Sequence, residues 1–193
     1  ELLHRNVVVF MVGLPAAGKS TVIESRYGRL RRHDALTVID LDAEMVAHPQ
    51  YDPEDPDSVY RLQAAYLWAD SKVEDRFQSA LKNRSLSSYV RVVVDGTGTN
   101  IERQVRRISE ARAAGWFVKI LYVRVPAKTA IDRAALRKRS VSPEKIVYYQ
   151  AKIDPALRAT ARHADEVETV DHSFDMTEHL GHMNAGSTCF FSS

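Results

Sequence analysis

Residues 6 to 21 read NVVVFMVGLPAAGKST. The mostly apolar run Asn6 to Val12 is typical of a strand that is buried on both faces of a parallel sheet. The next eight residues, Gly13 to Ser20, fit the pattern G-x-x-x-x-G-K-[ST], and a helix is expected over Gly18 to Tyr27. A buried strand, a glycine-bounded loop and a helix in this order are the context in which that pattern cradles phosphate groups.

The loop has the chemistry that a triphosphate needs. Its two glycines let backbone N–H groups turn inward around phosphate oxygens, and the start of the helix adds a positive dipole. Lys19 is expected to reach the β- and γ-phosphates, and the hydroxyl of Ser20 is expected to bind Mg²⁺. The sequence thus predicts a nucleoside triphosphate site formed by Gly13, Leu14, Pro15, Ala16, Ala17, Gly18, Lys19, Ser20 and Thr21.

The composition indicates an ordinary globular domain. The chain has 193 residues, of which 45% are apolar and 27% charged, enough for one α/β domain. The net charge of +2 is too small for a protein that coats DNA, although its 27 basic residues include 19 arginines. The single Cys189 excludes an intramolecular disulfide and a zinc site built from cysteines.

The sequence carries no signal for a membrane or for secretion. No apolar run approaches the ~20 residues of a membrane helix, and no signal peptide is found, so a cytoplasmic protein without a membrane partner is expected. Because the first residue is Glu1 rather than Met, a fragment or processed product is expected. Residues 1–172 are predicted to form the domain, and residues 173–193 a tail that is poorly ordered or added. Histidines of this region, His172 included, are interpreted as polar residues rather than metal ligands.

Strand-like and helix-like segments alternate along the chain, the pattern of an α/β layer with a parallel sheet. We therefore expect a P-loop NTPase fold, a three-layer α/β sandwich with a five-stranded parallel sheet. The further strands are expected at 36–39, 89–94, 117–125 and 166–170. One or two further amphipathic helices are expected over 58–83, which Ser58 would cap, and another at 101–114, which Gly115 would close.

Three aspartates follow the expected strands at the edge where the phosphate loop lies. Asp40 and Asp42 end the second strand, and Asp95 ends the third. Ligands of parallel sheets gather at the carboxyl ends of the strands, so these carboxylates are expected to face the same crevice as the loop. A carboxylate there can orient an acceptor hydroxyl; the alternative interpretation is that it caps a helix or a turn.

An arginine-rich segment, residues 128–139, is expected to form a helical lid. Arg133 and Arg137 lie four residues apart and so share one helical face, Arg139 follows, and residues 140–143 break the helix. Arginines on a lid neutralise the charge of a phosphoryl group as it moves. The alternative interpretation of this segment is a solvated helix face.

Other classes of P-loop protein are disfavoured. The chain has no N/T-K-x-D motif to recognise guanine, and its third strand ends Val94-Asp95-Gly96 rather than in Asp-Glu. The compact kinases remain, in which an acceptor hydroxyl rather than water attacks the γ-phosphate.

From Asn6 to Asp171 the chain resembles the zeta-toxin-like kinases, relatives of the polynucleotide kinases. The resemblance rests on the phosphate loop, on Ile39-Asp40-Leu41-Asp42 followed by His48-Pro49, on Asp95-Gly96-Thr97, and on the arginine lid. It implies an ATP or GTP donor with Mg²⁺ and transfer of the γ-phosphoryl group to a sugar hydroxyl, which in the toxins belongs to a UDP-linked amino sugar.

The resemblance makes Asp42 the catalytic base. We expect Lys19, Arg133, Arg137 and Arg139 to act on the phosphoryl group, and the substrate to be contacted by Asp40, Asp95, Thr97 and Asn100. Two positions depart from the family pattern, because Asp95 stands where Glu is usual and Met45 stands where phage-type polynucleotide kinases have Arg. A kinase for a nucleotide sugar or a nucleotide-like small molecule is therefore expected. A polynucleotide 5′-hydroxyl kinase and a non-catalytic nucleotide-binding module are the alternatives.

Overall fold

The computed structural model describes residues 6–31, 35–83, 91–137 and 141–173. Its elements, in chain order, are β1 (Val7–Val12), α1 (Lys19–Arg31), β2 (Leu36–Asp40), α2 (Leu41–Val46), η2 (Val59–Arg61), α3 (Gln63–Lys82), β3 (Arg91–Asp95), α4 (Ile101–Ala113), β4 (Phe117–Arg124), α5 (Ala127–Ala135), α6 (Pro143–Ala161) and β5 (Glu166–Asp171). Here η2 is a single turn of 3₁₀ helix. Apart from Ser173, the predicted tail lies outside the described residues.

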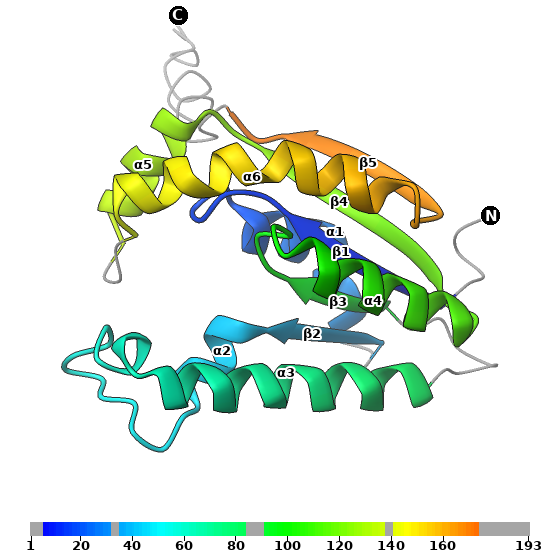
Figure 1. Ribbon diagram of the computed structural model, residues 1–193, viewed down its shortest axis with the longest axis horizontal. Helices are drawn as coiled ribbons and strands as arrows, with labels where there is room; N and C mark the ends of the chain where they lie inside the picture. Colours follow the sequence, from blue (N-terminus) through cyan, green and yellow to red (C-terminus); the bar gives the residue numbers. More distant parts are fainter. Residues whose placement is uncertain (1–5, 32–34, 84–90, 138–140, 174–193) are drawn as a thin grey trace, which may run out of the picture.

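The strands form one parallel sheet in the order β2-β3-β1-β4-β5 (Figure 1). β1 lies at its centre, and all six side chains of that strand are buried, as its apolar sequence predicts. The expected five-stranded parallel sheet is therefore confirmed. In the pairing of β2 with β3, Asp40 lies opposite Asp95, so both carboxyl groups leave the sheet at the same edge.

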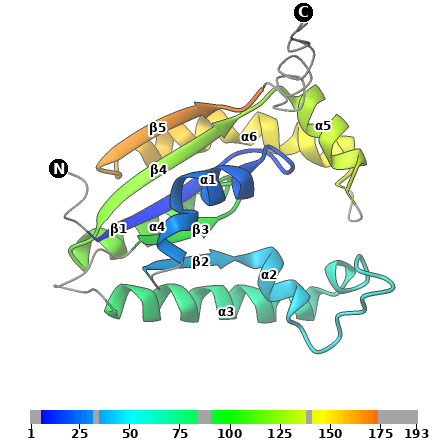
Figure 2. The same ribbon diagram turned by 180° about the vertical axis from the view of Figure 1, so that it is seen from behind.

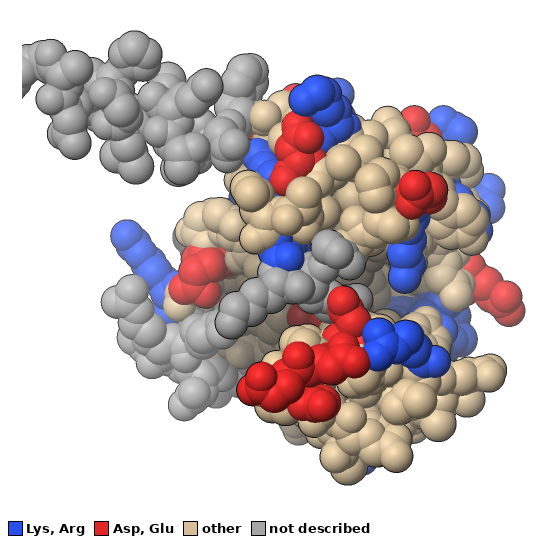
Figure 3. All heavy atoms as spheres, turned by 90° about the vertical axis from the view of Figure 1, so that its left-hand side faces the viewer, with Lys and Arg blue, Asp and Glu red and all other residues tan. Residues whose placement is uncertain are grey.

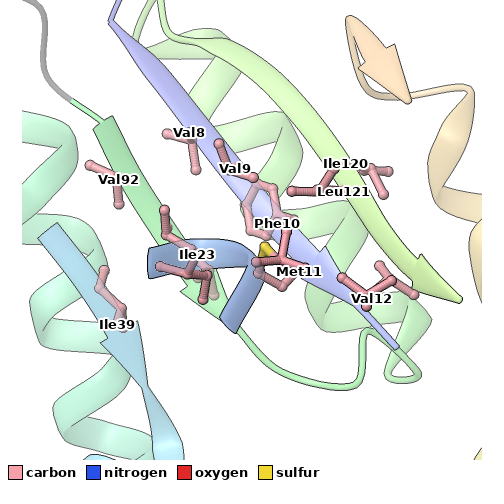
Figure 4. Packing of buried hydrophobic residues seen from close by; sticks show 14 of the residues in the cluster. Val8, Val9, Phe10, Met11, Val12, Ile23, Ile39, Val92, Ile120 and Leu121 are labelled. Carbon is pink, nitrogen blue, oxygen red and sulfur yellow. The ribbon is translucent and has the colours of Figure 1, made fainter. Parts of the chain in front are cut away.

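Helices cover both faces of the sheet, which completes the predicted three-layer sandwich. α4 and α6 lie in front of the sheet in Figure 1, and α1 lies behind it, as the reverse view in Figure 2 shows. The core lies around β1, where Phe10 and Met11 are surrounded by side chains such as Ile23, Ile39 and Ile120 (Figure 4). Phe10 also packs against Phe77 of α3, with the ring centroids 6.0 Å apart.

The segment 58–83, predicted to form one or two helices with Ser58 as the cap, divides near its start. The chain first forms η2, then turns extended at Leu62, and α3 begins at Gln63. Ser58 makes no side-chain cap, because its hydroxyl donates backward to the carbonyl oxygen of Asp55 at 2.6 Å. The turn of η2 buries Val59 in a small second cluster with Met45, which explains why the helix does not extend through it.

Helix α6 has no counterpart among the expected elements. Its start carries a recognisable signal, since the Ser142 side chain accepts a hydrogen bond from the Lys145 N–H and Pro143 occupies the first turn. The expected lid helix is also shorter than predicted. α5 ends at Ala135, so Arg137 lies beyond the helix rather than on a face shared with Arg133.

Among the residues that the structure describes, no helix is both long enough and apolar enough to cross a membrane.

Candidate active site

The loop between β1 and α1 folds tightly against its neighbours. A Cβ atom at Gly13 would lie 2.7 Å from the carbonyl oxygen of Val123, and the Gly13 N–H donates to the carbonyl oxygen of Thr97 at 3.3 Å. Gly18 has a φ of +88°, in the left-handed region that favours glycine. Both glycines of the sequence pattern are therefore required by the backbone itself.

The side chain of Lys19 folds back over this loop. Its Nζ atom donates to the carbonyl oxygens of Leu14 at 3.0 Å and Gly13 at 3.4 Å. Burial lowers the pKa of Lys19, whereas the negative charges of Asp95 and Asp42 oppose that shift. An ammonium group held by neutral carbonyls can exchange these contacts for the stronger ones that phosphate oxygens offer.

A cavity of about 480 Å³ opens at the carboxyl ends of the strands. Figure 3 faces this side of the molecule, which is hollowed between its upper and lower parts. Of the predicted triphosphate-binding loop, Pro15 to Ser20 line the cavity, whereas Gly13 and Leu14 are buried and Thr21 is exposed on α1. The cavity is also lined by further predicted site residues: Asp40, Asp42, Asp95, Thr97, Asn100 and Arg137.

Asp40 and Asp42 have different surroundings although they are two residues apart. Asp40 is the N-cap of α2, and its Oδ1 atom accepts a hydrogen bond of 3.0 Å from the Asp42 backbone N–H. Asp42 occupies the first turn of α2 and is exposed to solvent. The capping role considered for these aspartates thus falls on Asp40, and the carboxylate of Asp42 faces the open cavity.

Burial, with repulsion from neighbouring aspartates, raises the pKa values of the two carboxyl groups at the sheet edge. The pKa of Asp40 rises to about 6, chiefly through burial and then through the charge of Asp95. Burial likewise raises the pKa of Asp95, and the charge of Lys19 opposes that shift. A cation placed among these groups would relieve the repulsion between them.

Thr97 and Asn100 hold the loop between β3 and α4 in shape. The hydroxyl groups of Thr97 and Thr99 lie 2.9 Å apart, within hydrogen-bonding distance. Asn100 caps α4, since its side chain accepts a hydrogen bond of 3.0 Å from the Arg103 N–H. Both residues border the cavity, so the loop shapes the site as well as lining it.

The two predicted lid arginines that the structure describes, Arg133 and Arg137, have separate positions. Arg137 borders the cavity, and its charge acts on both Lys19 and Asp95. Arg133 instead extends toward the end of β5, where it donates to the carbonyl oxygen of His172 at 3.1 Å. Arg139 lies outside the described residues.

His172 contacts the phosphate loop, a contact that the polar-tail interpretation of this residue missed. Its Nδ1 atom lies 3.1 Å from the carbonyl oxygen of Ala17 and 3.3 Å from an η-nitrogen of Arg133. A Cβ atom at Gly18 would lie 2.5 Å from the imidazole ring, so the ring packs directly on that glycine. The end of β5 and helix α5 are thereby joined to the loop.

Three helices line the cavity with side chains that the sequence did not single out. The added residues are Tyr66, Asp70 and Val73 of α3, Arg103, Gln104 and Arg107 of α4, and Val141, Lys145 and Tyr149 in and before α6. The helical periodicity of residues 58–83 does predict a buried face for α3, and the Ser142-Pro143 signal could have located α6. Neither signal identifies which side chains meet the cavity, because that depends on how the helices pack across the sheet.

The residues present fit a nucleoside triphosphate with Mg²⁺. Among the described residues, no three His, Cys, Asp or Glu side chains lie together in a way that could hold a metal ion by themselves. Mg²⁺ commonly binds through one or two protein oxygens together with substrate phosphates, and Ser20 and Asp40 offer such oxygens beside the loop. Ser20 and Asp40 would hold the ion, and Lys19 with the loop would hold the phosphates.

Known proteins share this fold at low sequence identity. A structure from the PezAT toxin–antitoxin system of Streptococcus pneumoniae superposes with a TM-score of 0.63 at 14% identity, covering 86% of this chain and 68% of the other. The AvrRxo1-ORF1:AvrRxo1-ORF2 structure also gives 0.63, at 11% identity over 86% of this chain and 55% of its own. A putative kinase from Chloroflexus aurantiacus gives 0.55, at 12% identity over 93% of this chain and 97% of its own. These likenesses show the fold.

A family assignment follows from the sequence match. No curated protein matches the chain. Residues 8–156, from the first strand into α6, match a family described as AAA domain. The chain, a P-loop kinase-like domain, therefore belongs to the AAA domain family (AAA_33).

Proposed function

We propose that the protein transfers the γ-phosphoryl group of ATP or GTP to a hydroxyl group of a nucleotide sugar or a similar nucleotide-like small molecule. The observation that carries the proposal is the convergence on one cavity of Lys19, Asp42 and Arg137, which come from the phosphate loop, from α2 and from the segment after α5. Phosphoryl transfer needs these three functions: phosphate binding, orientation of the acceptor, and neutralisation of charge.

The donor end of the cavity is formed by the phosphate loop. Lys19 exchanges its contacts with the carbonyls of Gly13 and Leu14 for phosphate oxygens, and the N-terminus of α1 adds a positive dipole. Bound Mg²⁺ supplies neutralisation of the phosphate charge. Arg137 approaches from the other wall, where its charge already acts on Lys19 and Asp95.

The acceptor end is formed by the aspartate edge of the sheet and the walls beyond it. Asp42 lines the cavity from the first turn of α2, where its carboxylate orients an acceptor hydroxyl and takes its proton. Asp95, Thr97 and Asn100 border the same end and contact the acceptor. Tyr66 and Tyr149 offer aromatic side chains from α3 and α6 to a ring of the acceptor.

A nucleic-acid acceptor is less well supported. Met45 is 1% exposed and packs in the small cluster with Val59, so α2 offers no cation at that position for a backbone phosphate. In addition, the α4 arginines at the cavity, Arg103 and Arg107, are paired with carboxylates. A chain of nucleotides needs such cations along its backbone.

The test is transfer of labelled γ-phosphate from ATP or GTP, with Mg²⁺, to a panel of acceptors: UDP-sugars, dinucleotides, nucleosides and 5′-hydroxyl oligonucleotides. We expect label on a UDP-sugar or a nucleoside, and none when Lys19 is replaced by Ala. Label on oligonucleotides alone would identify a polynucleotide kinase. Mg²⁺-dependent binding of ATP without transfer to any acceptor would identify a non-catalytic binding module.

A further inference from the structure

Two buried polar atoms beside the cavity lack a partner among the described residues: Oδ1 of Asp95 and Nε2 of Gln104. Gln104 is 7% exposed and lines the cavity from α4, and Asp95 lines it from the end of β3. Buried polar groups in folded proteins are nearly always hydrogen-bonded, since leaving one unpaired weakens the fold. A pair of orphaned atoms in a cavity wall therefore points to a ligand.

The charge of the α4 wall disfavours an anion as the ligand of Gln104. Arg103 donates to both carboxylate oxygens of Asp70, at 2.6 and 3.2 Å. Arg107 donates to Glu74 through two nitrogens, at 3.1 and 3.0 Å. With these guanidinium groups paired, a phosphate or carboxylate group at Gln104 would find no unpaired arginine on the α4 wall and would lie in the same cavity as the carboxyl of Asp95. The cations whose charges act on Asp95, Lys19 and Arg137, come instead from the phosphate loop and from the segment after α5.

A neutral hydroxyl ligand matches the hydrogen-bonding needs of the two atoms. Gln104 Nε2 is a donor and needs an acceptor, whereas the carboxylate oxygen of Asp95 accepts and needs a donor. Hydroxyl groups serve both atoms, because each hydroxyl can donate one hydrogen bond and accept others. A sugar or another polyol supplies several of them in a small volume.

Resting on the function proposed above, we propose that Gln104 is a specificity-determining residue, which with Asp95 binds hydroxyl groups of a polyhydroxylated acceptor other than the hydroxyl that is phosphorylated. The reacting hydroxyl lies at Asp42, and Gln104 recognises the substrate through a non-reacting hydroxyl. An acceptor that lacks this hydroxyl leaves the buried amide of Gln104 unpaired and binds more weakly.

The ligand-free protein provides the first test. Gln104→Leu removes a buried amide that has no partner at Nε2, so the melting temperature should stay within about 2 °C of the parent value or rise. Gln78→Leu is the matched control, because the Gln78 amide donates to Glu74 and Glu110 at 2.9 Å each, and its melting temperature should fall. An equal fall for Gln104→Leu would mean that this amide already has a structural partner, such as a bound water, and would overturn the proposal.

The second test uses acceptors that differ by one hydroxyl: UDP-glucose and its monodeoxy analogues, and ribonucleosides with their deoxy counterparts. The parent protein should prefer a hydroxylated member by about tenfold or more in kcat/KM, and Gln104→Leu should lose that preference mainly through KM. Gln78→Leu should keep it. A preference that is equal in the parent protein and in Gln104→Leu would refute the role of Gln104 while leaving the kinase activity established.

A third readout does not depend on catalysis. In ¹⁵N spectra, the side-chain amide signal of Gln104 should shift when UDP-glucose is added and shift less with the deoxy analogue that lacks the recognised hydroxyl. A signal that stays unmoved at saturating UDP-glucose, while ATP with Mg²⁺ still binds, would refute the Gln104 inference alone. Absence of both ATP binding and transfer would instead refute the proposed function.

Discussion

The carboxylate of Asp40 accepts a hydrogen bond of 3.0 Å from the backbone N–H of Asp42. This contact gives different surroundings to the two aspartates at the end of β2. Asp40 caps the start of α2, whereas Asp42, two residues further, lies in the first turn of that helix and lines the cavity. Two acidic residues of one sequence motif therefore have different surroundings in the folded protein.

Asp42→Asn should retain binding of ATP and acceptor but lower the transfer rate by about 10² to 10⁴, because an amide cannot take the proton of the acceptor hydroxyl. Asp40→Asn is the matched control: asparagine is an equally good cap, so transfer should fall far less. Single-turnover transfer of labelled phosphate measures both. Parent-like transfer by Asp42→Asn with an inactive Asp40→Asn would move the base to Asp40.

Lys19→Ala should abolish ATP binding and transfer together, since it removes the ammonium group of the phosphate loop. Titration calorimetry with ATP and Mg²⁺ gives the binding constant. Lys82→Ala, an exposed change at the end of α3, should leave it unaltered. Tight, Mg²⁺-dependent binding by Lys19→Ala would show that the loop is not the donor site.

Arg137→Ala should lower kcat by about 10²-fold or more, with a smaller effect on ATP affinity, because the arginine matters most when charge spreads over the moving phosphoryl group. Arg133→Ala should lower the melting temperature instead, since this side chain joins α5 to the His172 carbonyl. Steady-state kinetics and thermal melts separate the two effects. An unchanged kcat for Arg137→Ala would transfer the role to Arg139.

The pH dependence of stability should report on Asp40. Its pKa is about 6 in the folded protein and near 3.8 in a free carboxyl group, so the folded state holds the proton more tightly than the unfolded chain. The stability this contributes is complete below pH 3.8 and is lost as the pH rises through 6. Because Asp40 is partly exposed, the loss should amount to only about 1 kcal/mol.

The Asp40→Asn variant keeps the helix cap but has no carboxyl group to lose a proton, so its stability should not fall over this pH range. In the absence of Mg²⁺, its free energy of unfolding should therefore rise relative to that of the parent protein between pH 4 and pH 7. Urea unfolding at each pH measures the difference. Asp75→Asn, an exposed change on α3, should show no such trend. A constant difference across the range for Asp40→Asn would contradict the raised pKa.

The local sequence was sufficient to predict the phosphate loop, the strands and the edge of the sheet at which the strands end. The pattern from Gly13 to Ser20 is recognisable because its defining residues lie within eight consecutive positions and glycine is needed at both ends. Strand β1 is likewise recognisable, since a short run of six apolar residues directly before this pattern is typical of a strand buried on both faces. Parallel pairing then brings Asp40 and Asp95 side by side.

Tertiary packing decided the walls of the cavity and the role of each charged side chain. No spacing in the sequence shows that Arg133 turns to His172, 39 residues away, or that Arg103 is neutralised by Asp70, 33 residues away. The unpaired amide of Gln104 is also a product of burial between elements. The partners and the burial of a polar side chain depend on contacts between segments that are distant in sequence. The sequence shows which polar groups are present, but not which of them remain available to a ligand after folding.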